Sequence, residues 1–396
     1  MRRVFLPKKG TLSAEALQDL AYKLQQTGSN KEVNAVLIAT ATGVDDVSNE
    51  VPIAESGLSS LVQNIARVDL DYSKTDFFRG YDTDEQKSYA NELNSIQNLA
   101  RAIHSMSPTP AITVCNGNTA DGGFALCLGR YNLATIKSSF QILHPLRGLT
   151  LEGGLSFALP RLAFRKSFNR KNDVPLDKVL ALTGYQADCY DMVTTGLATH
   201  FTEADKLDVL ERDLGNLYTF DERTMVDSVL DEIMMLYSSG NTYQDDDFAN
   251  DFEWVAVGPD DSKEAPFQLG ERKGSMLVDL AVAFKDVFNE DSVVGIVERL
   301  KEVKDSETEN DDIKGYAAHF LEGVEARSPL AVHATFRLLN EGRSRQTLES
   351  CLQREEAVQL KLMEGSDFKA GGGDSPDWKH KSVADVSADE VEELFG

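Results

Sequence analysis

Apolar positions in the first part of the chain alternate between short strand-type runs and stretches of helical periodicity. Continuous apolar runs predict buried strands at residues 3–6, 34–39, 111–115 and 132–136. Apolar residues three and four apart predict helices at residues 13–26, 91–105, 123–130 and 155–162. This alternation predicts an α/β fold in which helices cover the faces of a mostly parallel sheet.

The pattern changes in the other parts of the chain. Residues 40–90 are rich in Gly, Asp and Ser and weakly patterned, which predicts long loops with short helices. The second half is almost wholly helical in pattern, apart from acidic stretches near residues 238–267 and 303–312, which we interpret as a surface insertion and a mobile connection. We therefore expect an α/β core over residues 1–175 and a helical C-terminal region over residues 176–396.

Charge and hydropathy limit the kinds of partner. The 396-residue chain has no apolar stretch near the roughly 20 residues that span a bilayer, so no membrane partner is expected. Its formal net charge of −25 argues against extended direct binding to nucleic acid, because phosphate backbones are bound by Lys and Arg. Protein contacts, or one basic patch within a nucleoprotein assembly, are compatible with this charge.

One basic cluster stands out against this acidity. Five basic residues fall within eleven positions: Arg161, Arg165, Lys166, Arg170 and Lys171. The cluster has three interpretations: it holds the phosphates of coenzyme A, it contacts RNA in an assembly, or it is the solvated face of a helix. The sequence leaves all three open, and we expect at most limited direct RNA contact.

The cysteines and the N-terminus suggest in which cellular compartment the protein is found. Cys115, Cys127, Cys189 and Cys351 lie far apart, without the spacing of a zinc site or a disulfide framework. We interpret them as reduced, mostly buried thiols and expect no metal site. Four basic residues precede the first acidic one, Glu15, which is faintly similar to a mitochondrial presequence. A mitochondrial location is therefore one expectation.

Four stretches of sequence carry a resemblance to a known family. The segment VCNGNTADGGFALCLGRYNLATIKSSFQILHPLRGLTLEGGLSFALPRL, residues 114–162, resembles the crotonase (enoyl-CoA hydratase/isomerase) superfamily. Residues 180–201, 328–342 and 374–395 look like the 3-hydroxyisobutyryl-CoA hydrolase branch of that superfamily. The resemblance implies the crotonase fold, a spiral of ββα units with a helical C-terminal region.

The resemblance also implies where reactive groups would stand. Such enzymes stabilise a thioester oxyanion with two backbone N–H groups, one of them from a Gly triplet at a helix N-terminus. The triplet here reads Asp121-Gly122-Gly123, which keeps Gly122 as the expected donor but places a carboxylate beside it. The second donor should fall within residues 39–52, where the branch's motif is absent. His144 stands where the branch has a glutamate, and Glu152 stands where it has an aspartate.

These changes leave two hypotheses for function. His144 and Glu152 form an acid/base pair of a divergent acyl-CoA thioester hydrolase, with CoA thioester as substrate and no separate cofactor. Alternatively, both are polar residues left in an idle cleft. We favour the second, because several reactive positions differ at once: a catalytically degenerate protein acting as a structural subunit among protein partners. The resemblance suggests one such role, since a hydrolase-like protein of this branch occurs in the mitochondrial small ribosomal subunit.

Overall fold

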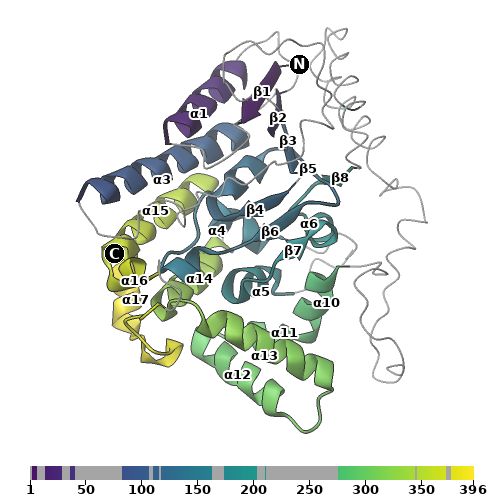
Figure 1. The fold of residues 1–396 in the computed structure, drawn as a ribbon, viewed down its shortest axis with the longest axis vertical. Coiled ribbons are helices and arrows are strands. Elements are labelled where there is room, and N and C mark those ends of the chain that lie inside the picture. Colours follow the sequence, from purple (N-terminus) through teal and green to yellow (C-terminus); the bar gives the residue numbers. More distant parts are fainter. Residues whose placement is uncertain are drawn as a thin grey trace.

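Two small sheets lie at the centre of the computed structural model (Figure 1), which describes residues 2–6, 14–28, 36–40, 83–106, 110–115, 117–162, 174–202, 210, 275–343, 346–371 and 376–396. The larger sheet is parallel and has the order β1 (Arg2–Leu6), β2 (Val36–Thr40), β3 (Ala111–Cys115), β5 (Tyr131–Ala134) and β8 (His200–Phe201). The smaller sheet has the order β4 (Asn118–Ala120), β6 (Ser139–Gln141) and β7 (Ala187–Asp188). Strand β6 pairs parallel with β4 and antiparallel with β7.

Helices of the first half lie between and beside these strands. They are α1 (Ala14–Gly28), α3 (Thr83–His104), the 3₁₀ helix η2 (Asp121–Leu128), the 3₁₀ turn η3 (His144–Arg147), α4 (Leu155–Ala158) and the 3₁₀ turn η4 (Leu159–Arg161). Helices α1 and α3 pack side by side through buried leucines such as Leu17 and Leu93 (Figure 1). All five residues of β3 are buried, as expected for a central strand of a parallel sheet with both faces covered.

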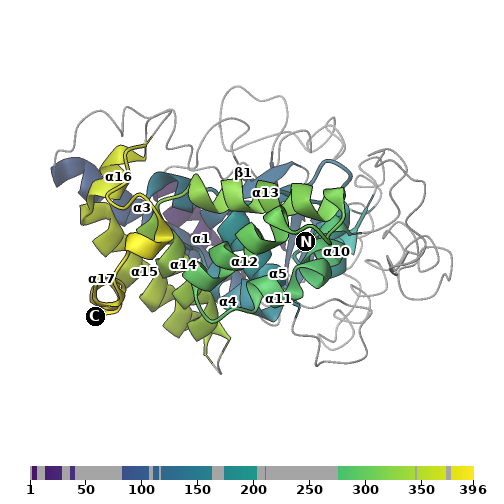
Figure 2. The same ribbon diagram turned by 90° about the horizontal axis from the view of Figure 1, so that it is seen from below.

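The second half of the chain supplies most of the remaining helices. They are α5 (Leu176–Thr183), α6 (Cys189–Thr195), α10 (Met276–Ala283), α11 (Lys285–Phe288), α12 (Val293–Asp305), α13 (Asp311–Glu325), α14 (Pro329–Gly342), α15 (Leu348–Glu364), α16 (Ser366–Ala370), the 3₁₀ turn η7 (Val383–Asp385) and α17 (Ala388–Phe395). Helices α12 and α13 form a hairpin at one end of the molecule, and α15 lies near α3 (Figures 1 and 2).

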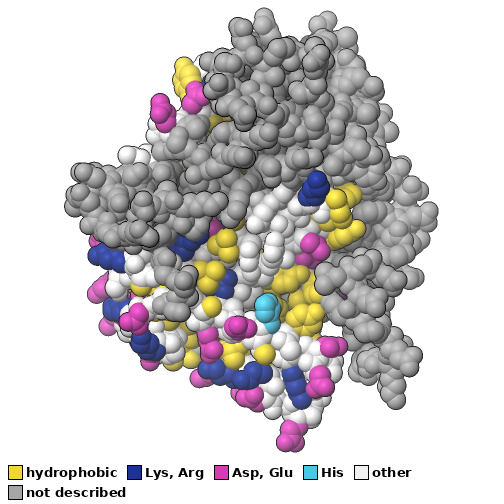
Figure 3. Space-filling model, in the orientation of Figure 1, with side chains coloured by type: hydrophobic (Ala, Val, Ile, Leu, Met, Phe, Trp, Pro, Cys, Tyr) yellow, Lys and Arg dark blue, Asp and Glu magenta, His cyan; other side chains and the backbone are white. Residues whose placement is uncertain are grey.

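The surface of the α12–α13 hairpin carries both signs of charge. Basic and acidic side chains are interspersed over this part of the face in Figure 3. Arg299 pairs with Glu302 at 2.7 Å, and Lys301 pairs with Glu325 at 3.4 Å. Such exposed pairs contribute little to stability. Acidic residues nevertheless outnumber basic ones between residues 293 and 325, so the hairpin presents a net negative surface.

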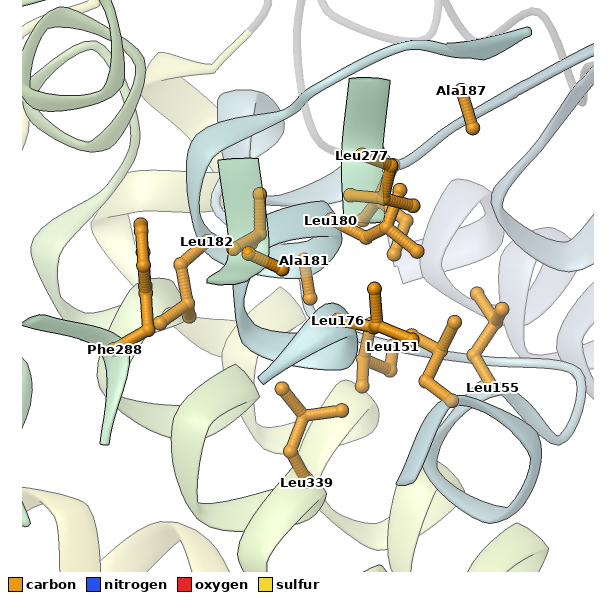
Figure 4. Close-up of a cluster of buried hydrophobic side chains, with 14 of the residues drawn as sticks. Leu151, Leu155, Leu176, Leu180, Ala181, Leu182, Ala187, Leu277, Phe288 and Leu339 are labelled. Atoms are coloured by element: carbon orange, nitrogen blue, oxygen red, sulfur yellow. The ribbon is translucent and has the colours of Figure 1, made fainter. Parts of the chain in front are cut away.

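The two halves of the chain both contribute to each of two hydrophobic clusters. Leu151 and Leu155, which lie within the segment that carries the family resemblance, pack with Leu180 of α5, Leu277 of α10 and Leu339 of α14 (Figure 4). Strands β7 and β8 also come from beyond residue 175; β7 is part of the smaller sheet and β8 is part of the larger one. The sheet and the core therefore connect the two regions that the sequence pattern distinguishes.

Several predicted elements are confirmed with small shifts at their ends, and three predictions are wrong in part. Helix α3 begins at Thr83, so the last part of the region predicted as loops and short helices is a long helix. The predicted helix at 123–130 is a 3₁₀ helix that begins at Asp121. The predicted helix at 155–162 divides into α4 and η4, since Pro160 has no N–H for a helical hydrogen bond.

The acidic stretch at residues 303–312 contains the connection between two helices, which is shorter than predicted and confined to residues 306–310; its mobility stays a prediction. Helix α12 continues to Asp305, and α13 begins at Asp311 with its N-terminus capped by Asn310, whose side chain accepts a hydrogen bond from the N–H of Ile313. Two acids in the first turn of α13 are favourable there because of the helix dipole. The other acidic stretch, at residues 238–267, lies outside the described residues. Within the described ranges, no helix is long and apolar enough to cross a membrane.

Two glycines of α13 make a matched test of this packing. A Cβ on Gly323 would lie 2.2 Å from the carbonyl oxygen of Thr183 in α5, whereas a Cβ on Gly315 would meet nothing within 4 Å. We expect Gly323→Ala to lower the free energy of unfolding by about 1–3 kcal/mol through overpacking. Gly315→Ala should raise it by about 0.5–1 kcal/mol, because alanine favours the helix. Urea denaturation of both variants measures this, and an equal effect of the two changes would contradict the close α5–α13 contact.

Candidate active site

Two neighbouring strands bring the predicted site residues together. Strands β4 and β6 pair in register, with Ala120 opposite Gln141, so the segments that follow them leave the same edge of the small sheet. Asp121 and Gly122 follow β4 directly, and His144 follows β6 after a short turn. Glu152 lies in the turn that leads into α4. The structure therefore places Gly122, His144 and Glu152 at one point, as the resemblance predicts.

The Asp121 carboxylate links the two segments. Its Oδ1 accepts hydrogen bonds from the N–H groups of Leu143 at 2.9 Å and His144 at 3.1 Å. Asp121 is also the one non-glycine residue with positive φ in the described chain, at 44°. Aspartate tolerates this left-handed conformation better than most residues do. The side chain therefore points toward the site and contributes its charge there.

His144 is almost fully enclosed, with 2 % of its surface exposed. Its Nδ1 lies 2.9 Å from the carbonyl oxygen of Thr150. A carbonyl can only accept a hydrogen bond, so this contact uses a proton on Nδ1 and orients the ring; the Gln359 amide Nε2 lies 3.3 Å from the same nitrogen. The other nitrogen, Nε2, lies 3.5 Å from Glu152 Oε1 and 3.7 Å from Asp121 Oδ2. Nε2 therefore faces two carboxylates.

Glu152 is completely buried and contacts a helix from the far end of the chain. Gln359 of α15 donates from Nε2 to Glu152 Oε2 at 3.3 Å. The same amide accepts a hydrogen bond from the N–H of Thr150 at 2.8 Å through its Oε1. Gln359 thus holds both the carboxylate and the chain two residues before it.

The Glu152 carboxylate also occupies the space over Gly122. A Cβ on Gly122 would lie only 2.4 Å from Glu152 Oε1, so the carboxylate packs directly against the glycine. This places a negative group beside the N–H expected to receive an oxyanion. Two like charges about 4 Å apart repel by about 1–4 kcal/mol, depending on the effective dielectric. The arrangement therefore opposes the charge that thioester chemistry develops.

A second buried carboxylate supports the same turn. Glu355, one helical turn before Gln359 on α15, accepts hydrogen bonds from the N–H groups of Gly154 at 2.9 Å and Ser156 at 2.7 Å. Burial raises the pKa of Glu355 to about 7; these hydrogen bonds oppose the shift, and the charge of Glu152 adds to it. Sequence analysis missed Glu355 and Gln359. The sequence signal for these two residues was their spacing: they are polar residues four positions apart on the otherwise apolar face of a helix.

One positive charge is buried near these acids. Arg327 is 3 % exposed, and burial lowers its pKa to about 10, an effect that the charge of Asp121 opposes. Its Nη1 donates to the carbonyl oxygen of Gly323. A Cβ on Gly184 would overlap the guanidinium, so the glycine makes room for it. Arg327 therefore partly balances the negative charge of the site.

The other predicted site residues lie elsewhere. Arg161 stacks on the ring of Phe157 at 3.9 Å and donates to the carbonyl oxygens of Gly342 and Gln346, each at 3.0 Å. Arg165, Lys166, Arg170 and Lys171 lie outside the described residues, as does most of the stretch at 39–52 in which the second oxyanion donor was sought. The phosphate or RNA contact of this cluster stays a prediction.

A cavity of about 390 Å³ opens near Arg161 and the C-terminal part of η2. Its wall includes Phe124, Cys127, Phe157 and Leu197, and none of Gly122, His144 or Glu152 lines it. In the part of the chain that the structure describes, no group of three or more His, Cys, Asp or Glu side chains is arranged to hold a metal ion.

The raised pKa of Glu355 predicts a pH-dependent stability. Its ordinary value is 4.5, so the folded state holds the proton more tightly than the unfolded state does. The free energy of unfolding should therefore fall as the pH rises from about 4.5 to about 7, by at most about 3 kcal/mol from this group. In Glu355→Gln this part of the slope should disappear, as measured by urea denaturation at several pH values. Glu364→Gln, at the exposed end of α15, is the control; an unchanged slope in Glu355→Gln would contradict the assignment.

Comparison with known proteins agrees with this architecture. A family model described as Enoyl-CoA hydratase/isomerase matches residues 75–257 and 260–395. The chain is 28% identical over 294 residues to the mitochondrial 3-hydroxyisobutyryl-CoA hydrolase of Danio rerio, covering 72% of this chain and 64% of that protein. It is 25% identical to the corresponding human protein, of which 63% is covered. The match thus spans slightly less than two thirds of these relatives.

Solved structures show the same fold over nearly the whole chain. A carnitinyl-CoA dehydratase from Mycobacterium thermoresistibile has a TM-score of 0.63 at 18% identity, covering 98% of this chain and 90% of that one. An enoyl-CoA hydratase from Rhodobacter sphaeroides has a TM-score of 0.61 at 17% identity, covering 100% and 94%. The predicted crotonase fold with a helical C-terminal region is confirmed, and the chain belongs to the enoyl-CoA hydratase/isomerase family.

Proposed function

We propose that this protein is a non-catalytic member of its family, a pseudoenzyme retained as a structural and interaction subunit. The observation that carries the proposal is the position of the Glu152 carboxylate, fully buried and packed against Gly122. Catalysis of acyl transfer needs donors aimed at the place where negative charge develops. Here a carboxylate takes the space beside the expected donor, and a second one, Asp121, lies near the same nitrogen of His144.

The closure of the site supports the same proposal. His144 and Glu152 are 2 % and 0 % exposed, and Gln359 joins Glu152 to the backbone of Thr150. A thioester would have to displace Gln359 and separate Glu152 from Gly122 before reaching either group. The cavity of about 390 Å³ does not help, because its wall includes neither residue.

We further propose a mitochondrial assembly as the place of this subunit, with the small ribosomal subunit as the specific candidate. The relatives named as mitochondrial hydrolases support the compartment. The net charge of −25 and the acidic α12–α13 hairpin favour attachment through basic protein surfaces, with limited direct contact to RNA. A peripheral position in the assembly fits this charge.

A divergent acyl-CoA thioester hydrolase is the second candidate function. The observation in its favour is the 3.5 Å separation of Glu152 Oε1 and His144 Nε2 in a family whose relatives include 3-hydroxyisobutyryl-CoA hydrolases. Glu152 would activate water or attack the thioester carbonyl, His144 would transfer the proton, and Gly122 would be the single oxyanion donor. This function needs α15 to withdraw Gln359 from the site.

A thiol-release assay with 3-hydroxyisobutyryl-CoA separates the two functions. For a non-catalytic protein we expect no turnover above background, and the same background for Glu152→Gln and for the surface control Glu364→Gln. The hydrolase instead predicts turnover that falls by about 10²-fold or more in Glu152→Gln alone. Calorimetric titration with CoA accompanies the assay. Turnover that depends on Glu152 would overturn the non-catalytic proposal.

Sedimentation of mitochondrial extracts through a sucrose gradient tests the proposed assembly. We expect the protein to co-sediment with the small ribosomal subunit and to leave it as salt rises, because contacts between an acidic surface and basic partners are screened. Finding the protein only among free proteins at low salt would rule out the ribosomal role. That result would leave the question of catalysis to the thiol-release assay.

A further inference from the structure

Two of the four cysteines meet where β3 packs against η2. Cys115 is the last residue of β3 and Cys127 lies near the end of η2, and their Sγ atoms are 3.5 Å apart. Both thiols are free. The Thr113 hydroxyl donates to the carbonyl oxygen of Leu126 at 2.7 Å, which holds the strand and the helix together at this point. The two sulfur atoms are therefore kept in van der Waals contact by ordered backbone.

Asn132 of β5 orients this pair. The Cys115 thiol donates to Asn132 Oδ1 at 3.1 Å. The amide cannot turn freely, because its Nδ2 donates to the carbonyl oxygen of Leu197 at 2.7 Å. With its proton directed at Asn132, Cys115 presents sulfur lone pairs to Cys127, and the Cys127 thiol donates to Cys115. Cys115 is thus oriented as a nucleophile toward the sulfur of Cys127.

The two cysteines differ in access. Cys127 is 8 % exposed and lines the cavity of about 390 Å³, which is wide enough to admit a small molecule. Cys115 is 0 % exposed and lies behind it. The other two cysteines are on α6 and α15, away from this contact. The cavity therefore leads to one sulfur of a pair whose second sulfur is shielded.

We propose that Cys115 and Cys127 form an oxidation site that takes hydrogen peroxide, a two-electron oxidant, and yields an intramolecular disulfide. The Cys127 thiolate attacks one peroxide oxygen, the O–O bond breaks, and the sulfenic acid and hydroxide form. Cys115 then attacks the Cys127 sulfur, the S–O bond breaks, and the proton of Cys115 leaves with the hydroxyl group as water. The disulfide joins β3 to η2, whose first turn carries Asp121 and Gly122.

The surroundings make this site slow at neutral pH. The hydrogen bond with Cys115 and burial raise the pKa of Cys127 well above its usual value. Only the thiolate attacks peroxide, so the rate of oxidation should rise about tenfold for each pH unit over the range in which Cys127 is mostly protonated. This pH dependence distinguishes Cys127 from an ordinary exposed thiol.

The test is peptide mapping of the full chain after treatment with hydrogen peroxide at pH 7 and pH 8. Free thiols are alkylated without reduction, and the digest is analysed by mass spectrometry. We expect a peptide pair linked through Cys115 and Cys127, a loss of 2 Da, and about tenfold faster formation at the higher pH. Cys351→Ala should form the same linkage, because Cys351 lies on α15.

Two variants of the pair make the proposal falsifiable. In Cys115→Ala the linkage should be lost while Cys127 sulfenic acid accumulates and is trapped by dimedone; in Cys127→Ala, Cys115 should stay reduced. Circular dichroism shows whether each variant is folded, and Cys115→Ser replaces the first if it is not. Linkage through Cys189 or Cys351, equal oxidation of all four thiols, or four thiols unchanged at both pH values would overturn the proposal.

Discussion

Glu355 and Gln359 lie one helical turn apart on α15, and both reach the loop of residues 150–156. A buried carboxylate or amide is costly unless its polar atoms find partners, so these side chains and the loop must keep a definite geometry toward each other. The loop carries Glu152 and the glycine turn into α4, and Thr150 in turn orients His144. The positions of Glu152 and His144 therefore depend on a helix from the other end of the chain.

The fold of the family and the changed side chains of the site can coexist because different contacts hold them. The strands β4 and β6 and the start of η2 are part of a fold shared with solved enoyl-CoA hydratases, and the two strands are held by backbone pairing. The charges placed on that frame are unusual: two carboxylates next to one imidazole, with Arg327 nearby. Such a cluster stays buried only while its partners remain in place, which favours a closed and rigid interior over one that opens for a substrate.

The sequence predicted the strands and the place of the site better than it predicted the side-chain contacts between distant segments. Apolar runs marked β1, β2 and β3; all five residues of β3 are buried, which explains its continuous hydrophobicity. The resemblance placed Gly122, His144 and Glu152 in one site. Gln359 was not foreseen, because its partners lie more than 200 residues away and no local pattern encodes them. The connection predicted at residues 303–312 was drawn too long, because acids in the first turn of a helix resemble a charged loop in composition. The role of the basic cluster from Arg161 to Lys171 stays a prediction.

The left-handed backbone at Asp121 has a consequence for how this chain can change. At φ 44° the position retains a conformation that glycine adopts freely, although a side chain now occupies it. A single replacement by glycine would thus need no rearrangement of the main chain. It would delete a carboxylate and release two N–H groups together. One substitution, Asp121→Gly, would therefore convert this turn into the triple-glycine turn that the family resemblance implies.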